Sequence, residues 1–554
     1  MPMLSGADKE EAIQLGNQQN WEELLKRGKD AWNTWAEHEI SKTSDKIPCI
    51  EFRSQNQDLR KITTSDFNGF KFPCPIFFNK IKFSRNVRFS ECEFQEDLNF
   101  LHCRFEKSSL FSGTEFRGLF FDDVTFCGET DLSSVDFYEN TEILNTTFES
   151  EVVFSHSTFH KELNLYKTNF NQTVLFHKTT FKKSVTFRAN FKGYTSFHQA
   201  AFCKESDFST SIFDTTIIFD ESQFIENVTF SQSHFKSFIY FQGTEFHKEA
   251  KFTKSIIKGQ LSFKPKIVKQ QVSFSGASFS EHADFSGTQF DGDVIFTDTH
   301  FEKSALFSNC YFQKEAIFLR TVFAGYTSFE NSSFSDQTCP NFRSTVFLET
   351  RSPELYGTSI KYQVSEECPC HKILNICKYD DGYERYRILK KMAAQNHNHD
   401  DEVYYFSLEM KAKRHHLHKY TDLSKFVVLA FNHAYGALSD FGQSIVRPLT
   451  GLLLTALFFA YSYSGLLAQN WLERLLLVAK FESAIWTAVA INLFPFAGQV
   501  SIGRDVAKKQ LCPTESATPD CMATLYKIST CEGVLAFIFL FLIGLALRNI
   551  ARIK

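Results

Sequence analysis

The chain has 554 residues, with 60 Lys and Arg against 64 Asp and Glu, and a formal net charge of −4. This length predicts several domains, and the nearly balanced charge gives no indication of nucleic-acid binding. The 14 cysteines show no spacing typical of a disulfide framework, and the polar segment Met1–Gln19 contains no secretory signal peptide, which favours a reducing cytosol for most of the chain.

The N-terminal segment 1–48 is predicted to be a helical cap. Residues 9–40 are expected to form one amphipathic helix, whose apolar stripe consists of Trp21, Leu24, Leu25, Gly28, Trp32 and Trp35. An open end of a stacked β-structure exposes unpaired backbone groups, so we expect this helix to cover the first turn of the domain that follows. An independent binding helix is the alternative.

Phenylalanine recurs at alternating spacings of five and six residues through most of segment 49–350. The pattern is clearest in Phe274, Phe279, Phe285, Phe290, Phe296, Phe301, Phe307, Phe312, Phe318, Phe323, Phe329 and Phe334. A period of eleven residues matches neither a helix face nor simple strand alternation. A fixed repeat of short units indicates a solenoid, in which each unit buries its apolar face by stacking on the next.

A small or β-branched residue stands two positions before each of these phenylalanines. The set is Val272, Ala277, Ala283, Thr288, Val294, Thr299, Ala305, Cys310, Ala316, Thr321, Thr327 and Ser332. Residues two apart in an extended segment face the same side. Each unit is therefore expected to point one small side chain and one phenylalanine inward, and the residues between them outward.

This pattern of Ala, Val or Thr two residues before a phenylalanine resembles the pentapeptide-repeat proteins, in their Phe-centred variant with spacings of five and six. The resemblance implies a β-solenoid, a right-handed quadrilateral β-helix of about 22 residues per coil, with Phe274, Phe296 and Phe318 in one stack. The rhythm slips at Phe187–Phe191 and around Lys264–Lys269, where we expect a bulge or a loop.

Segment 351–446 is predicted to contain a cysteine-containing linker, a helical hairpin and a juxtamembrane segment. Tyr386, Leu389 and Met392 line the first helix of the hairpin, and Val403, Phe406, Met410 and Leu417 line the second. In the linker, Cys368, Cys370, His371 and Cys377 are of the types that ligate zinc. Their spacing lacks the usual C-x2-C pairs, so an ordinary loop with reduced thiols is the simpler interpretation, and no metal or cofactor is predicted.

Segment 447–554 is predicted to be a membrane domain with two transmembrane helices. Residues 448–467 carry no charge, and residues 533–547 are apolar and reach spanning length if the turn through 526–531 is included. Lys and Arg flank the outer ends of this pair, which predicts a multi-pass protein of the cell membrane with both termini cytoplasmic and 468–527 outside. The segments 439–448 and 546–552 resemble the membrane domain of larger bacterial pentapeptide-repeat proteins.

A short apolar helix at 481–494 is expected between the two spans, as a pore-like or an interfacial element. If it is pore-like, Asn492, Pro495 and Gly498 would line the path, although the chain lacks the Thr-Val-Gly-Tyr-Gly filter of potassium channels. Glu482 and Glu532 would be functional if the bilayer buried them, but we expect both in water at the outer interface.

The outside loop carries Cys512 and Cys521. An oxidising exterior would allow these two cysteines to form a disulfide, provided that their Cα atoms lie within about 7 Å. Nothing in the sequence decides whether they pair.

The sequence contains none of the catalytic or phosphate-binding motifs we sought, so we predict that it is not an enzyme. The favoured interpretation is a membrane-anchored scaffold, in contact with membrane lipid, whose β-helix presents a surface to a cytoplasmic protein partner. The alternative is a subunit of an oligomeric ion-channel-like pore with the β-helix as regulatory domain, and a homo-oligomer is compatible with either. A DNA-mimic, gyrase-binding role, as in some small family members, conflicts with the balanced charge and the apolar C-terminal segment.

Overall fold

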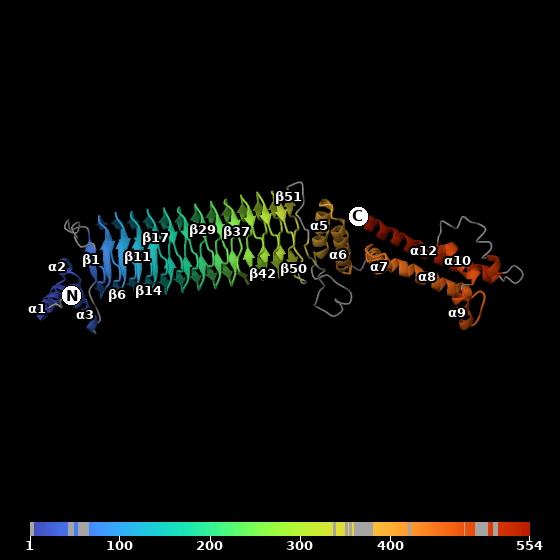
Figure 1. Cartoon of the computed structure of the whole chain (residues 1–554), viewed down its shortest axis with the longest axis horizontal. Coiled ribbons are helices and arrows are strands. Elements are labelled where there is room, and N and C mark those ends of the chain that lie inside the picture. Colours follow the sequence, from blue (N-terminus) through green and yellow to red (C-terminus); the bar gives the residue numbers. More distant parts are fainter. Residues whose placement is uncertain are drawn as a thin grey trace. The chain divides into compact units, whose positions relative to one another are not determined.

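The computed structural model describes residues 5–42, 49–53, 66–335, 339–348, 353, 357–358, 360, 381–418, 423–480, 482–493, 508–512 and 519–553. The chain divides into two compact units, Met1–Lys361 and Tyr362–Lys554. Unit 1 contains the N-terminal helices and all the named strands, and unit 2 contains the remaining helices (Figure 1). The two units are described separately.

Three helices, not one, form the N-terminal segment: α1 (Gly6–Asn17), α2 (Trp21–Lys26) and α3 (Lys29–Ser41). The expectation of a single helix is wrong because the backbone takes left-handed conformations at Gln19, with φ 57°, and at Gly28, with φ 87°. Glycine adopts this conformation at no steric cost. The chain therefore turns twice and packs α1 and α2 against α3.

Helix α3 contacts β2 (Lys71–Phe72), the first strand of one solenoid face, where a cap was expected. The indole Nε1 of Trp32 donates a hydrogen bond to the carbonyl of Lys71 at 2.8 Å. The side-chain amide of Asn33 accepts from the Lys71 N–H at 2.9 Å and donates to the Gly69 carbonyl at 3.0 Å. These bonds satisfy backbone groups that an open end would leave unpaired.

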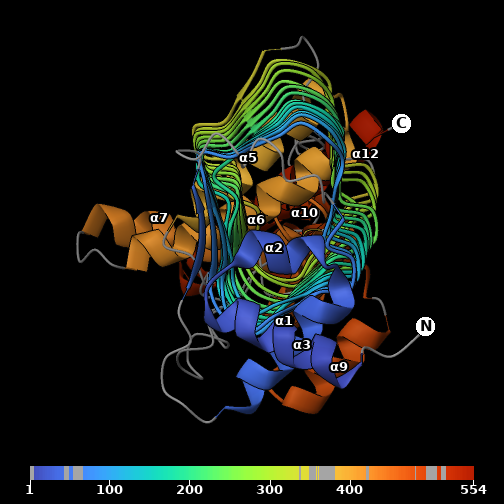
Figure 2. The same cartoon turned by 90° about the vertical axis from the view of Figure 1, so that its left-hand side faces the viewer.

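The repeats form a four-faced β-solenoid of very short parallel strands, from β1 (Ile50–Arg53) to β51 (Val346–Phe347). One coil is β39 (Val272–Ser273), β40 (Ser278–Phe279), β41 (Ala283–Asp284) and β42 (Gln289–Phe290), after which β43 (Val294–Ile295) begins the next. Val272 pairs with Val294, and Val294 with Ala316, so each coil takes 22 residues. The predicted coil length and stacking are confirmed, and Figure 2 shows the coils overlying one another.

Stacked phenylalanines fill the interior of the solenoid. The ring of Phe296 lies 5.1 Å from that of Phe274 and 5.2 Å from that of Phe318, with planes within 3° of parallel. Phe285 and Phe307 form a neighbouring stack at 5.0 Å. All twelve predicted core phenylalanines and all twelve small residues of the preceding slot are buried, which confirms the predicted inward face.

The small inward slot also carries a ladder of hydrogen bonds. The hydroxyl of Thr299 donates to the carbonyl of Phe274 at 2.8 Å, and that of Thr321 donates to the carbonyl of Phe296 at 2.6 Å. The Cys310 thiol contacts the Phe285 carbonyl in the same way at 3.1 Å. At these three positions the buried hydroxyl or thiol finds a partner within the previous coil, which explains why Thr and Cys are tolerated there in an otherwise apolar core.

The two predicted slips have different outcomes. At Phe187–Phe191 the coil is one residue shorter, because Asn169 pairs with Asn190, 21 residues later, and the strands continue without a loop. Around Lys264–Lys269 one face of the solenoid divides into a ten-stranded sheet that ends at β38 (Ile267–Val268) and a three-stranded sheet that begins at β42. The second slip therefore interrupts a hydrogen-bond ladder, as expected.

We predict that the buried solenoid cysteines resist alkylation in the folded protein. Burial raises the pKa of the Cys310 thiol to about 12, and the thiolate is the reactive form. At pH 8, iodoacetamide should modify the exposed Cys49 within minutes and leave Cys310 unmodified until the protein is denatured. Peptide mass spectrometry measures both sites, and equal rates at Cys49 and Cys310 would contradict the inward assignment.

Unit 2 contains α5 (Gly382–Gln395), α6 (His399–His418), α7 (Leu423–Ser439), α8 (Val446–Ser464), α9 (Trp471–Ala479), α10 (Ser483–Leu493) and α12 (Pro519–Ile553). The hairpin of α5 and α6 was predicted, and Tyr386, Leu389 and Met392 are buried in it. In α6, however, the buried side chains include Tyr405, Leu408 and Ala412, whereas the predicted Val403, Phe406 and Met410 are only partly buried. Helices α7 and α9 were not predicted.

Among the described residues, α12 is the helix long and apolar enough to cross a membrane, over Asp520–Asn549. Helices α9 and α10, bent by 72° at a short break, would make a second span only if counted as one. Residues 526–531 belong to this helix, so the inclusion that the predicted second span required for crossing length is present. The predicted first span at 448–467 forms α8, which is not among the described helices long and apolar enough to cross a membrane. Two full spans are therefore not supported.

Candidate functional site

Most of the predicted site residues lie outside the described part of the chain. These are Cys368, Cys370, His371, Cys377, Pro495 and Gly498. In the described ranges no group of three or more His, Cys, Asp or Glu side chains could hold a metal ion. Asn492 is described, and it belongs to the most distinctive polar cluster of unit 2.

Helices α8 and α12 are apolar on their outer faces and carry a few polar side chains among mostly apolar ones inside. Their outward side chains include Leu453, Leu454 and Phe458 on α8 and Val534, Phe537 and Phe541 on α12, with exposed fractions between 55% and 65%. Their buried side chains include Ser464 and Glu532. A helix in water shows the opposite pattern, whereas apolar surface outside and polar groups within are expected of helices in a bilayer.

The buried polar cluster joins three helices. The hydroxyl of Tyr463, on α8, donates a hydrogen bond to Glu532 Oε2, on α12, at 2.8 Å. The Nδ2 of Asn492, on α10, lies 3.2 Å from the same carboxylate oxygen and 3.0 Å from the Tyr463 hydroxyl. Ser529, one helical turn before Glu532, donates its hydroxyl hydrogen bond to Asn492 Oδ1 at 3.0 Å. Each helix thus supplies at least one member of a connected network.

The expectation that Glu532 lies in water at an interface is wrong, because its side chain is 0% exposed. Glu482, by contrast, is exposed as expected. The second carboxylate oxygen of Glu532, Oε1, is buried without a hydrogen-bond partner. Burying a carboxylate is costly unless partners compensate it, so the donors from Tyr463 and Asn492 account for its position in an apolar bundle.

A cavity of about 520 Å³ opens beside this cluster, between α8, α10 and α12. Three of the cluster residues line it: Tyr463, Asn492 and Ser529. The remaining described lining is mostly apolar, except for Lys508 and Thr530. Cavities of this size, with apolar walls and a few convergent polar groups, are typical of small-molecule sites.

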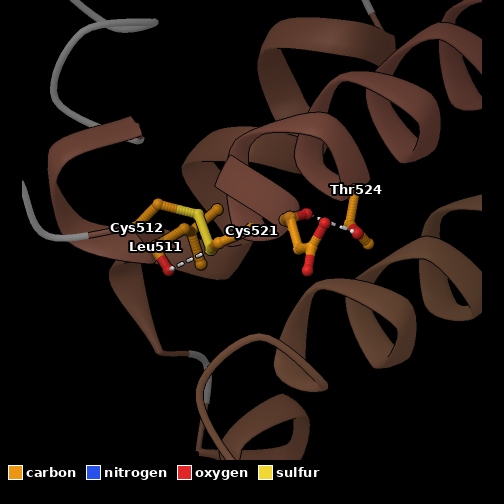
Figure 3. The surroundings of a disulfide bond; sticks show 5 residues. Leu511, Cys512, Cys521 and Thr524 are labelled. Atoms are coloured by element: carbon orange, nitrogen blue, oxygen red, sulfur yellow. Dashed lines mark hydrogen bonds between the residues drawn. A yellow bond between two sulfur atoms is a disulfide. The ribbon is translucent and has the colours of Figure 1, made fainter. Parts of the chain in front are cut away.

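Cys512 and Cys521 form a disulfide, with Cα atoms 6.2 Å apart (Figure 3). The bond joins the segment before α12 to the first turn of that helix. The pairing that the sequence left undecided is therefore present.

The cluster was missed from the sequence because its members are far apart in the chain. Tyr463, Asn492 and Glu532 span 69 residues and three helices. One signal was available: Ser529 and Glu532, at positions i and i+3, must share a helix face, and that face also carries Ala536 and Leu525, both buried. A carboxylate on the inward face of an apolar helix predicts an internal partner.

A second candidate surface lies on one face of the solenoid in unit 1. We name it the aromatic strip: Val153, Leu175, Tyr194, Ile218, Phe238 and Tyr240. These residues come from β17 (Val152–Val153), β21 (Val174–Leu175), β29 (Ile217–Ile218) and β33 (Ile239–Tyr240), and from the residue before β25 (Thr195–Ser196) and before β33. These five strands are neighbours in one sheet. Val153, Leu175, Ile218 and Tyr240 share one column, which is interrupted by Ser196, and Tyr194 and Phe238 lie two residues before this column in their own coils.

The aromatic strip presents apolar surface at positions that face solvent. Phe238 is 40% exposed and Tyr194 37%, and the rings of Phe238 and Tyr240 stack at 6.2 Å. The corresponding outward positions of the facing sheet include Asn164, Asp207 and Lys251, which are polar. Exposed apolar and aromatic side chains gathered on one face of a domain are a feature of interaction sites.

The profile of the family described as Pentapeptide repeats (9 copies) matches residues 268–310. These residues cover β39 to β45 (Ala305–Leu306) of the solenoid. The same 22-residue register extends through the neighbouring coils in both directions. No curated protein and no solved structure matches the chain.

Proposed function

We propose that this pentapeptide-repeat protein, whose solenoid precedes a helical unit with apolar outer faces, is a membrane-attached scaffold for a protein partner. The observation that carries the proposal is the pair of apolar outer faces on α8 and α12 over a buried carboxylate. Such a surface would be poorly soluble in water and is matched by lipid. Repeat solenoids typically offer long surfaces for partner binding.

The proposal includes an orientation. Lys and Arg at the C-terminal end of α12, such as Arg548, favour the cytoplasm for that end, and the disulfide at the opposite end favours the exterior. With α8 and α12 as a pair, both the solenoid and the C-terminus would be cytoplasmic. Cysteine labelling from each side of sealed vesicles, at Lys554 and at Glu515, tests this multi-pass arrangement.

We expect Phe541→Arg to abolish stable membrane attachment, whereas Thr524→Arg should leave it intact. Phe541 is 58% exposed in the middle of α12, and an arginine at mid-membrane costs about 3 kcal/mol or more. Thr524 is exposed near the start of the same helix, where the cost falls. Alkaline extraction of membranes measures the attached fraction.

A bilayer around α12 and water around α12 predict different results for Phe541→Arg and Thr524→Arg. If α12 faced water, Phe541→Arg would replace an exposed apolar side chain by a charge and change the free energy of unfolding by only about 0.5 kcal/mol. Equal recovery of both variants in the extracted fraction, with wild-type protein also extracted, would refute membrane attachment.

The partner surface that we assign to the scaffold is the aromatic strip. A photo-crosslinking amino acid at Phe238 should give a defined adduct in cells, and the same group at His234 should not. His234 lies in β32 (His234–Phe235), in the same coil but on the adjacent face, and is exposed. Adducts of equal yield at both positions would indicate that the strip has no special role.

An oligomeric pore remains the second candidate, and the contact that favours it is that between Asn492, the predicted pore residue, and the buried Glu532 at 3.2 Å. A polar network in a membrane helix bundle is a frequent element of ion pathways. The test is conductance of the reconstituted protein in planar bilayers, with Asn492→Leu as the variant. Changed ion selectivity in that variant would favour the pore over the scaffold.

A further inference from the structure

We propose that the cavity beside the buried cluster binds one membrane amphiphile with an anionic headgroup. The headgroup would lie at the end formed by Asn492, Ser529 and Lys508, and one acyl chain would lie along Val534, Phe537 and Ile538. The inference rests on the proposed membrane attachment and adds a specific ligand class to it.

The polar end of the cavity is suited to an anion. Among the described residues that line the cavity, Lys508 is the one with a charged side chain. Its Nζ lies over the ring of Tyr526, 5.1 Å from the ring centroid. No carboxylate of the described residues lies within ion-pair distance of it. The side chains of Ser529 and Asn492, both half-buried, line the same end and are hydrogen-bonded to each other, so Lys508 is the group that would pair with a phosphate.

The apolar end of the cavity continues into the outer surface of α12. Val534, Phe537 and Ile538 line the cavity and are also exposed, at 57%, 55% and 39%. On a membrane helix these side chains meet acyl chains. A lipid could therefore enter sideways from the bilayer, without crossing the polar cluster.

The available volume fits part of a lipid rather than a whole one. About 520 Å³ lies in the range of small-ligand sites and accommodates a headgroup and the first part of one chain. Apolar walls with a single cation at one end select an amphiphile over a fully polar anion such as free phosphate, because the walls gain nothing from a polar ligand.

Two glycines of α12 offer a matched pair of variants that probe the cavity. Gly533 lines it, whereas Gly544 does not. A Cβ added at either position meets no atom within 4 Å, so a side chain can begin at both without a clash at its first atom. Gly533→Leu places a side chain in the cavity, and Gly544→Leu adds the same side chain elsewhere on the helix.

A second matched pair of variants, Lys508→Gln and Lys509→Gln, tests whether the positive charge of Lys508 binds the headgroup. The two lysines are adjacent in the chain, and only Lys508 lines the cavity. Full-length protein in detergent is titrated with phosphatidylglycerol, phosphatidylcholine or inorganic phosphate, and bound lipid is counted by native mass spectrometry. Each variant is also checked by alkaline extraction and by its helical circular dichroism.

The expected result is one phosphatidylglycerol per chain, lost in Gly533→Leu and bound at least about tenfold more weakly in Lys508→Gln. Gly544→Leu and Lys509→Gln should bind as the wild type does. Equal binding within both pairs would overturn the site, equal binding of phosphatidylcholine would overturn the anionic headgroup, and competition by inorganic phosphate alone would overturn the amphiphile. Any of these results with attachment intact refutes this inference and leaves the proposed function standing.

Discussion

Phe296→Ala is expected to lower the free energy of unfolding of the solenoid by about 3–5 kcal/mol, the usual cost of removing a fully buried aromatic ring. The side chain is 0% exposed. It stacks between Phe274 and Phe318 and meets the rings of Phe285 and Phe307 edge-on at 5.3 and 5.4 Å. The coil is closed by hydrogen bonds above and below, so the cavity left by alanine cannot collapse.

The matched control is Glu302→Ala, which should change the free energy of unfolding by no more than about 0.5 kcal/mol. Glu302 is exposed one residue after the buried Phe301. Asp298 is a poorer control, because its backbone is left-handed at φ 57° and its carboxylate meets Arg320 at 2.6 Å. Thermal unfolding followed by the β-sheet circular dichroism signal compares the variants, and equal melting of the two would contradict the Phe-stack core.

The solenoid could be predicted in detail because its determinants are local and repeated. Each coil contains the same alternation of a small residue and a phenylalanine, so an error at one unit is corrected by its neighbours. The period of 22 residues and the inward face both follow from this repetition. The single-residue deletion before Asn190 shows the limit, since spacing alone did not distinguish a shortened turn from a loop.

The helical units were harder to predict because tertiary contacts decide their structure. The breaks at Gln19 and Gly28 depend on left-handed turns that the apolar stripe of residues 9–40 does not reveal. The position of Glu532 depends on Tyr463, 69 residues earlier, and no single-segment hydropathy reports such a partner. An isolated acidic residue at the end of an apolar run is equally compatible with water and with a buried network.

The strongest test of the buried network is Tyr463→Phe. This change removes one hydroxyl and leaves Glu532 Oε2 without its shortest hydrogen bond, so we expect the free energy of unfolding of the helical unit to fall by about 1–3 kcal/mol. Tyr461→Phe is the control on the same helix, because Tyr461 is exposed. Thermal unfolding of the detergent-solubilised protein, followed by helical circular dichroism, gives both values.

A double-mutant cycle then separates the network from simple packing. In a Glu532→Leu background the Tyr463 hydroxyl has lost its carboxylate acceptor, so Tyr463→Phe should cost much less than in the wild type, with a coupling of about 0.5–3 kcal/mol. Packing alone predicts the same cost in both backgrounds, since the ring is retained. A coupling near zero would mean that the 2.8 Å contact does not stabilise the bundle, and that Glu532 is buried for a reason other than this hydrogen bond.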